Sequence, residues 1–140
     1  MKIYLDFDGT VVEHDYPRIG LINYGCIQVI SKLQKAGHDI TLNTLRVELN
    51  DDSLKQALQW FKDTKRMLRY KDSPIEDFGH TNSKFNPSSI PWNWEMMKSI
   101  DCMCIDDITP GIPLKKALRV TGNMVDWDEL DRQFKKHNIY

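Results

Sequence analysis

The first third of the chain alternates between short apolar runs and apolar residues at helical spacing. Residues 2–5 are mostly apolar and stop at a burst of acidic and small residues, which predicts a buried strand. From 22 to about 36, apolar side chains recur at helical spacing and Gly37 follows, which predicts an amphipathic helix. Residues 39–44 have the length and the β-branched content of a second strand.

The middle of the chain shows a weaker pattern. A helix capped by Asn50 or Asp51 should run to about 63, because apolar residues again recur at helical spacing. The stretch 67–70 offers at most a short strand. Residues 72–91 are rich in Pro, Ser, Asn and Gly and show no period, so we predict a long loop.

Regular patterns return in the last third. The apolar run 102–105 predicts a strand buried on both faces, and Asp126 begins a closing helix with a capping-box pattern. Trp92 and Trp94 should pack against the core at the end of the long loop. The order of strands and helices predicts an α/β fold with a parallel sheet and right-handed crossovers, in one domain spanning residues 1–140.

Acidic and polar side chains follow three of the predicted strands. Asp6 and Asp8 follow the first strand, Thr44 the second, and Asp106 and Asp107 the strand of the last third. Because ligands of parallel sheets bind beyond the carboxyl ends of the strands, we expect these side chains to meet. Carboxylates gathered in one place repel one another unless a cation shares them, and oxygen ligands suit Mg²⁺. A carboxylate beside Mg²⁺ can attack phosphorus and form an aspartyl-phosphate, so the pattern predicts phosphoryl-transfer chemistry.

The pentapeptide Asp6-Phe7-Asp8-Gly9-Thr10 resembles the first motif of the haloacid dehalogenase superfamily in its phosphatase form. The resemblance implies that Asp6 is the nucleophile. It also implies that Asp8 is the general acid and base and offers its backbone carbonyl to Mg²⁺. We expect Gly9 and Thr10 to lie against the substrate phosphate.

Two further motifs of the superfamily have counterparts in the same order along the chain. Thr44 stands where the family has a Ser or Thr that bonds the phosphoryl group, and Leu45 and Arg46 follow it as further substrate-binding candidates. Asp106 and Asp107 resemble the acidic pair that holds Mg²⁺. The metal ligands that we predict are therefore Asp6, Asp8, Asp106 and Asp107.

The third motif of the family is a lysine that steadies the aspartyl-phosphate. We assign this role to Lys98, just before the strand 102–105, with Lys84 in the long loop as the alternative. The segments where family members carry an inserted cap domain are short here. The resemblance therefore implies a three-layer, Rossmann-like fold without a separate cap domain. Such a protein accepts bulky substrates or takes a lid from a second subunit. A homo-oligomer that supplies this lid is therefore one of the alternatives.

Charge and hydropathy limit the classes of partner. The net charge of -1 gives no general reason to expect a nucleic-acid or membrane partner. A basic run leaves nucleic acid as a weakly supported partner, and cations that complement the dipole at a helix end are the favoured explanation of the run. This run consists of Lys62, Lys65, Arg66, Arg69 and Lys71. No apolar run is long enough to cross a bilayer and no signal peptide is evident, so we expect a cytoplasmic location without membrane contact.

Some reactive side chains have an ordinary structural explanation. Cys102 and Cys104 should be core residues, because no second Cys or His pair at zinc spacing accompanies them. His14 lies in the loop after the first motif and should be exposed, with contact to substrate as the alternative. Arg18, in the same loop, either binds an anion or pairs with Asp15.

The leading hypothesis is a Mg²⁺-dependent phosphatase, a phosphomonoester hydrolase that acts through an aspartyl-phosphate on a phosphorylated substrate. The alternative is a noncatalytic domain of the same family that binds phosphate or regulates a partner. A receiver-like signalling domain is disfavoured because its phosphate-accepting aspartate follows the third strand, whereas Asp6 follows the first.

Overall fold

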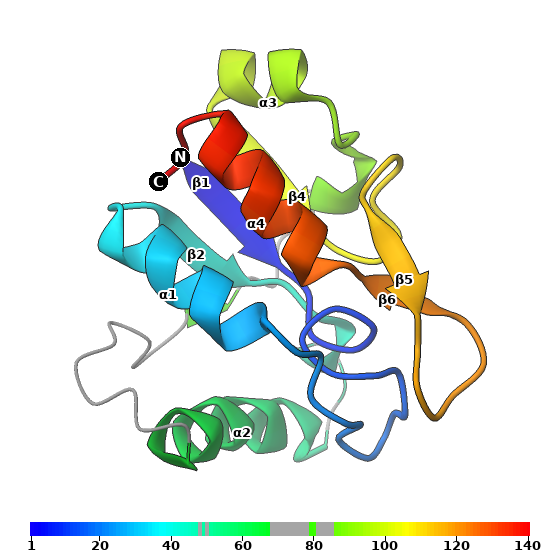
Figure 1. The fold of residues 1–140 in the computed structure, drawn as a ribbon. Coiled ribbons are helices and arrows are strands. Elements are labelled where there is room, and N and C mark those ends of the chain that lie inside the picture. The colour runs from blue at the N-terminus through cyan, green and yellow to red at the C-terminus, as the bar shows by residue number, and fades with distance from the viewer. Residues whose placement is uncertain (48, 50, 68–78, 81–85) are drawn as a thin grey trace.

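A parallel β-sheet built from both halves of the chain forms the centre of the fold (Figure 1). The computed structural model describes residues 1–47, 49, 51–67, 79–80 and 86–140. Within them the sheet has four strands in the order β3-β2-β1-β4, and all neighbouring strands are parallel. The strands are β1 (Lys2–Leu5), β2 (Asp39–Leu42), β3 (Gly79–His80) and β4 (Cys102–Ile105). The predicted α/β class with a parallel sheet is confirmed.

β1 lies between β2 and β4, and the register of these strands decides which residues meet at the end of the sheet. The last residue of β1, Leu5, pairs with the last residues of β2 and β4. The backbone N–H of Asn43 donates to the Leu5 carbonyl at 2.7 Å, and that of Asp6 donates to the Ile105 carbonyl at 2.9 Å. The residues that follow the three strands, Asp106 among them, therefore leave the sheet side by side.

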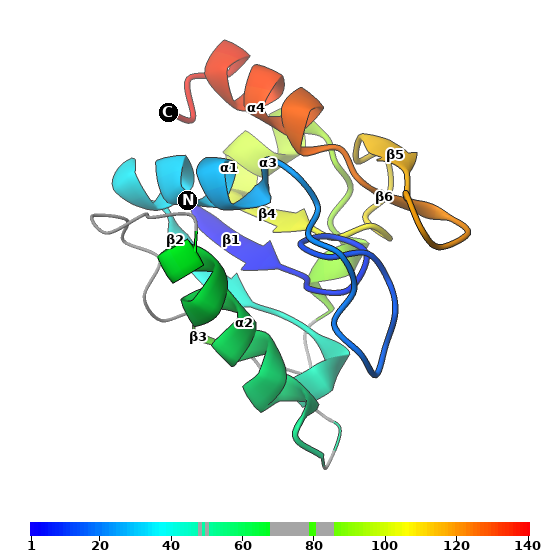
Figure 2. The ribbon, with the colours of Figure 1, turned by 60° about the horizontal axis from the view of Figure 1, so that its bottom comes forward.

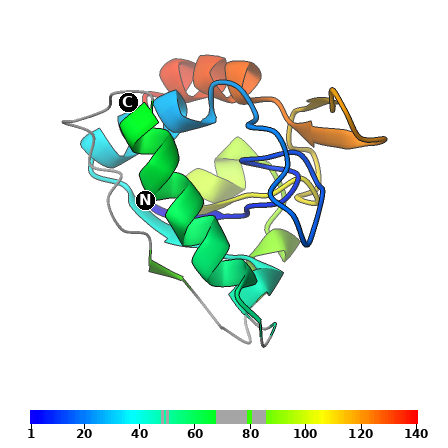
Figure 3. The ribbon, with the colours of Figure 1, turned by 90° about the horizontal axis from the view of Figure 1, so that it is seen from below.

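Helices cover both faces of the sheet, with α1 and α4 on one face and α2 on the other (Figures 1 and 2). Their bounds are α1 (Cys26–Lys35), α2 (Ser53–Met67) and α4 (Trp127–Lys136). Figure 2 shows α4 above the strands and α2 below them, and in Figure 3 α2 crosses in front of the strands. The rings of Trp60 and Phe61 on α2 meet the Phe7 ring edge-on, with centroids 5.6 and 5.7 Å away. In the described part of the chain no helix is long and apolar enough to cross a membrane.

A short helix that the sequence pattern did not predict leads into β4. Asn93 caps the amino end of α3 (Trp94–Ile100), because its side-chain oxygen accepts a hydrogen bond from the N–H of Met96 at 2.9 Å. Asp101 follows with a positive φ of 54° and ends the helix. With 7 residues, α3 is too short to show a repeated helical period in the sequence.

Two tryptophans attach the segment around α3 to α4. The indole N–H groups of Trp92 and Trp94 donate to the same acceptor, Oε1 of Gln133, at 2.8 and 2.9 Å. Their rings lie 6.1 and 5.9 Å from the ring of Phe134. The predicted packing role of both tryptophans is confirmed.

A second element that was not predicted is an antiparallel hairpin, β5 (Leu114–Lys116) and β6 (Asn123–Val125). It forms a two-stranded sheet of its own and stands beside the loop that follows β1 (Figure 1). Strands of 3 residues are too short for an alternating pattern to indicate them, so sequence periodicity gave no signal here.

Several predicted boundaries are wrong. α2 continues to Met67 instead of ending near 63, so residue 67 does not begin a strand, and 68–70 lie outside the described residues. α1 begins later and β2 ends earlier than predicted. Where it is described, the predicted loop 72–91 contains β3 and a short 3-10 helix at Pro87–Ser89. With only two residues, β3 is too short to show a periodic pattern in the sequence.

The cysteines of β4 behave as structural residues. Cys104 is buried, Cys102 is partly buried, and both are free thiols. Burial raises the pKa of Cys104 to about 12, so its thiol stays protonated and is a poor metal ligand at neutral pH. The expected core role is confirmed for Cys104 and holds in part for Cys102.

We predict that Asp126→Ala lowers the free energy of unfolding. The Asp126 carboxylate caps α4 by accepting a hydrogen bond from the N–H of Glu129 at 3.2 Å, as the capping-box pattern predicted. Loss of an N-cap acceptor costs about 1 kcal/mol. Asp126→Asn keeps the acceptor and should lose much less. Urea denaturation followed by circular dichroism measures both variants, and equal losses would show that the cap contributes nothing specific.

Candidate functional site

Three carboxylates converge where β1 and β4 end. Asp6, Asp106 and Asp107 each offer one oxygen, and these oxygens lie within 4.8 Å of one another. Asp106 is 7% exposed, whereas Asp6 and Asp107 are partly exposed. The register of the sheet brings together three of the four predicted metal ligands. These side chains form the acidic cluster of the site.

Thr10 joins the two sides of the acidic cluster. Its hydroxyl donates to Oδ2 of Asp6 at 3.1 Å and accepts from the N–H of Asp107 at 3.2 Å. Thr10 is fully buried, and its carbonyl oxygen accepts from Nδ2 of Asn23 and from the indole N–H of Trp127, both at 2.8 Å. No local sequence pattern indicates these last two contacts, because Asn23 and Trp127 reach Thr10 from 13 and 117 positions away.

Gly9 lets Asp107 approach the loop after β1. Its φ of +82° lies in the left-handed region, which favours glycine. A Cβ atom at this position would lie 2.7 Å from Oδ2 of Asp107, so any side chain would displace that carboxylate. The glycine of the predicted motif is therefore required by the site geometry, whether or not it touches substrate.

Burial and mutual repulsion favour protonated carboxyl groups in the acidic cluster. Burial, followed by the charges of Asp106 and Asp107, raises the pKa of Asp6 well above its ordinary value. Burial, together with the neighbouring Asp107, raises the pKa of Asp106 to about 7, although the N–H of Ile108 opposes this shift. A divalent cation among these oxygens would relieve the repulsion, and an oxygen-only donor set suits Mg²⁺.

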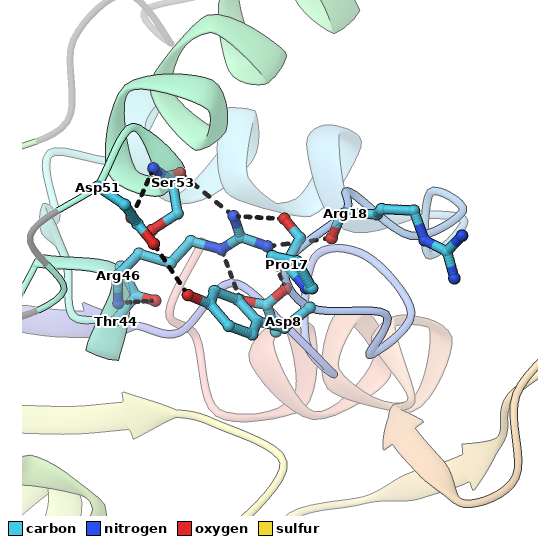
Figure 4. A network of polar contacts seen from close by, with 8 residues as sticks. Asp8, Pro17, Arg18, Thr44, Arg46, Asp51 and Ser53 are labelled. Atoms are coloured by element: carbon cyan, nitrogen blue, oxygen red, sulfur yellow. Dashed lines mark hydrogen bonds and ion pairs between the residues drawn. The ribbon is translucent and has the colours of Figure 1, made fainter.

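Asp8 does not belong to the acidic cluster, because its carboxylate is bound by Arg46 (Figure 4). The Nε–H and Nη2–H groups of Arg46 donate to the two Asp8 oxygens at 2.8 and 2.7 Å. The remaining N–H groups of Arg46 donate to the carbonyl oxygens of Pro17, Arg18 and Ser53. Every donor of this guanidinium, which is 1% exposed, has an acceptor within the protein.

Aromatic rings enclose the same guanidinium. Its central carbon lies 5.3 Å from the centroid of Phe7 and 5.1 Å from that of Tyr16, distances at which cation–π attraction operates. The Tyr16 hydroxyl donates to Asp51 at 3.1 Å, and Asp51 also accepts from the N–H of Ser53 at 2.9 Å. The loop after β1 is thereby bonded to the start of α2.

The three residues after β2 that were predicted to bind substrate differ in exposure and in their hydrogen bonds. The prediction that Arg46 binds substrate is wrong in this structure, because the side chain is buried and all its donors are engaged by the protein. Leu45, in the 3-10 helix Leu45–Val47, is 74% exposed. Thr44 is 8% exposed, and its hydroxyl oxygen accepts from the N–H of Arg46 at 3.3 Å. Its predicted bond to a phosphoryl group stays a prediction.

Lys98 lies at the wrong end of the sheet for the role assigned to it. It is exposed in the last turn of α3, which precedes β4, so it stands near the amino ends of the strands (Figure 1). Burial and then the charge of Lys98 lower the pKa of His137, which is the C-cap of α4. A strand of 4 residues spans roughly 13 Å, which separates Lys98 from Asp6. The alternative, Lys84, lies outside the described residues.

The remaining loop and basic residues follow their ordinary explanations where they are described. His14 is exposed, and the Arg18 side chain is 81% exposed and pairs with Asp15 at 3.3 Å. Lys62 is exposed on α2. The side chains of the other four basic-run residues lie outside the described part of the chain. The pairing interpretation of Arg18 is therefore the one that the structure supports.

Comparison with known proteins supports the fold alone. No family model matches the chain, and no curated protein matches it. A solved structure of a conserved protein from Bacteroides thetaiotaomicron is 24% identical over 97% of this chain and 90% of that chain, with a TM-score of 0.55. The similarity agrees with the α/β architecture described above.

We predict that Asp106→Asn stabilises the metal-free protein at neutral pH. The pKa of Asp106 rises from 3.8 to about 7 on folding. Between these values the folded state binds more protons than the unfolded state, so the free energy of unfolding falls as the pH rises. Asparagine cannot ionise, yet it keeps the oxygen that accepts from the N–H of Ile108 at 3.0 Å. One pKa unit corresponds to about 1.4 kcal/mol, so the gain at pH 8 should be a few kcal/mol at most.

Urea unfolding in EDTA at pH 5 and pH 8 measures this effect. The difference in stability between Asp106→Asn and the wild type should be small at pH 5 and larger at pH 8. A difference that does not change with pH would contradict the raised pKa of Asp106.

We also predict that Arg46→Met is strongly destabilising. It leaves the Asp8 carboxylate, whose side chain is 13% exposed, without its cation, and breaking a buried pair costs about 3–5 kcal/mol. Arg46→Lys keeps the charge but loses the two-pronged contact, so its loss should be smaller. The double variant Arg46→Met/Asp8→Asn should recover part of the stability. Chemical denaturation of the wild type, Arg46→Met, Asp8→Asn and the double variant gives the coupling energy, and strictly additive losses would show that the two side chains do not interact.

Proposed function

We propose that this protein is a Mg²⁺-dependent phosphatase that acts through an aspartyl-phosphate on Asp6. We further propose a three-layer, Rossmann-like fold of the haloacid dehalogenase type without a separate cap domain. The observation that carries the proposal is the convergence of Asp6 with Asp106 and Asp107 at the carboxyl end of a parallel sheet. The order of the motif-like residues along the chain supports it, and so does the arrangement of helices on both faces of the sheet.

Asp6, Asp106 and Asp107 would hold Mg²⁺, together with the backbone carbonyl of Asp8 that the family resemblance implies. The fit rests on the oxygen-only donor set, on the spacing of the three carboxylates within 4.8 Å, and on the burial and mutual repulsion that raise the pKa of Asp6 and Asp106. When bound, Mg²⁺ neutralises charge that otherwise keeps an anionic phosphoryl group away from a carboxylate.

The protein's own residues then divide the reaction between them. The Thr10 hydroxyl fixes the rotation of the Asp6 carboxylate. Attack of an Asp6 oxygen on phosphorus forms the aspartyl-phosphate and releases the leaving-group oxygen, which takes up a proton. Water then attacks the phosphorus, inorganic phosphate departs, and the Asp6 carboxylate is regenerated. Asp8 is the general acid and base that the family resemblance implies: it would have to leave its contact with Arg46 and take up a proton from solvent before protonating the leaving oxygen, and it would later accept a proton from the attacking water.

A noncatalytic phosphate-binding domain is the second candidate, and the position of Lys98 favours it. The family resemblance implies a lysine at the nucleophile, yet Lys98 stands near the opposite end of the strands. Among the described residues, no ion pair joins a Lys or Arg side chain to the acidic cluster. The phosphorylated substrate or ligand, and a lid from a second subunit, are part of the proposal in either case.

We predict that Asp6→Asn abolishes the hydrolysis of an aryl phosphate in Mg²⁺, because an amide is a very weak nucleophile. EDTA should abolish the wild-type activity in the same assay. Asp8→Asn cannot protonate a leaving alkoxide, which typically costs about 100 to 10,000-fold, so it should retain more of its phosphorylation rate on an aryl than on an alkyl phosphate. Mass spectrometry of the quenched Asp8→Asn protein should find the phosphoryl adduct on Asp6.

Asp101→Asn is the matched control for these variants. This side chain is 78% exposed at the amino end of the sheet, and asparagine tolerates its positive φ of 54°. The control should keep wild-type activity. An adduct on another residue, or normal turnover by Asp6→Asn, would refute the proposed mechanism, and phosphate binding without turnover by the wild type would support the noncatalytic candidate.

A further inference from the structure

The β5–β6 hairpin carries positive charge and has no acidic side chain of its own. Residues 108–125 include Lys115, Lys116 and Arg119 but no Asp or Glu. Lys116 and Arg119 are exposed, and Lys115 is partly exposed. In the described part of the chain none of the three forms an ion pair. Because the protein as a whole has a net charge of -1, this local group is a departure from its average surface.

The backbone of the hairpin is bonded to the loop that leads from β1 and lies beside it (Figure 1). At its base, the N–H of Val125 donates to the carbonyl oxygen of Gly9 at 3.2 Å. At its turn, the carboxylate of Glu13, which is 2% exposed, accepts from the backbone N–H groups of Leu118 and Arg119. Glu13 thus bonds to the backbone of the turn and leaves the Arg119 guanidinium free to meet a ligand.

Exposed apolar side chains accompany these cations. Leu118 in the turn is 71% exposed, and Tyr24 is also 71% exposed. Tyr24 lies near the foot of the hairpin, because the side chain of its neighbour Asn23 donates to the carbonyl oxygen of Val125 at 2.7 Å. Cations with exposed aromatic and apolar groups are the chemistry that binds single-stranded nucleic acid, where phosphates meet the charges and bases meet the rings.

We propose that the hairpin binds a single-stranded nucleic acid whose terminal phosphate enters the acidic cluster site. This inference rests on the proposed phosphatase function and names its substrate class. Lys116 and Arg119 would bind the phosphodiester groups that follow the terminal phosphate, and Tyr24 would contact a base. Hydrolysis consumes one water, releases inorganic phosphate and leaves a hydroxyl group at the strand end. An anionic lipid surface is the alternative occupant, and the binding experiment below distinguishes it from a nucleic acid.

Binding is measured by fluorescence anisotropy with a labelled short oligothymidylate that carries a phosphate at its 5′ or its 3′ end. Lys116→Gln/Arg119→Gln should bind at least one of the two probes roughly tenfold more weakly than the wild type. Its salt dependence should also be shallower, by about 0.7 in the slope of log K against log salt for each phosphate contact removed. The same variant should lose kcat/KM on the oligonucleotide by a similar factor and keep its kcat on an aryl phosphate.

Two control variants distinguish an effect of the hairpin cations from a general effect of positive charge on binding. Lys35→Gln/Lys136→Gln removes the same charge from exposed residues at the last turns of α1 and α4, near the amino ends of the strands, and should bind like the wild type. Lys116→Arg/Arg119→Lys keeps the charge of the hairpin and should retain most of the binding. Thermal denaturation of each protein checks that the fold is intact.

Several outcomes would overturn the inference. Undiminished oligonucleotide binding by the Lys116→Gln/Arg119→Gln protein would do so, and so would an equal loss in the Lys35→Gln/Lys136→Gln control. Weakened binding to phosphatidylserine vesicles with unchanged oligonucleotide binding would assign the hairpin to a membrane surface instead. If the wild type hydrolyses the aryl phosphate but neither oligonucleotide, the phosphatase proposal stands and the substrate class is wrong. Hairpin-dependent binding without hydrolysis of any substrate would instead refute the phosphatase proposal.

Discussion

The close spacing of three carboxylates at the ends of β1 and β4 is unfavourable, and contacts of the surrounding structure hold them in place. Asp6, Asp106 and Asp107 would separate if each could turn freely toward water, because like charges at this spacing repel. The sheet register fixes their backbone positions, and the hydroxyl of Thr10 fixes the orientation of Asp6. Gly9 leaves room for the third carboxylate. The protein therefore retains an arrangement that is unfavourable without a cation, as sites adapted to a ligand often do.

A second acidic group lies two residues from the nucleophile candidate in a different electrostatic environment. The guanidinium of Arg46 binds Asp8, whereas the Asp6 carboxylate lies beside those of Asp106 and Asp107 and accepts hydrogen bonds from the Thr10 hydroxyl and the Phe7 backbone N–H. The two environments differ because Arg46 reaches Asp8 from the segment after β2, whereas Asp106 and Asp107 reach Asp6 from the end of β4. The same pentapeptide thus presents one carboxylate in the acidic cluster and one that is bound by a cation of the protein.

The sequence predicted those parts of the fold that depend on local pattern. The strands that became β1, β2 and β4 follow from short apolar runs, and α1, α2 and α4 follow from apolar residues at helical spacing. The acidic cluster was predictable because each of its residues directly follows a strand, and the ends of parallel strands meet. β3, α3 and the hairpin are too short for periodicity, so their stability comes from contacts with distant segments.

The errors at the site have a common physical cause, which is that proximity along the chain does not specify direction in space. Lys98 is close in sequence to β4, but α3 brings it to the start of that strand and not to its end. Arg46 follows β2 at the correct end of the sheet, but the carbonyl oxygens that hold it belong to Pro17, Arg18 and Ser53. No local pattern could indicate these acceptors, because they are backbone atoms of two other segments.

The loop after β1 connects these features, since it is bonded on both flanks. On one side, Gly9 and Glu13 accept hydrogen bonds from the β5–β6 hairpin. On the other side, the carbonyl oxygens of Pro17 and Arg18 accept from Arg46, which also bonds the start of α2 through Ser53. A displacement of the loop would break contacts on both flanks at once and would move Asp8 with it. Among the described residues, the position of this loop, and of Asp8 within it, is therefore set by contacts with the hairpin on one flank and with Arg46 on the other.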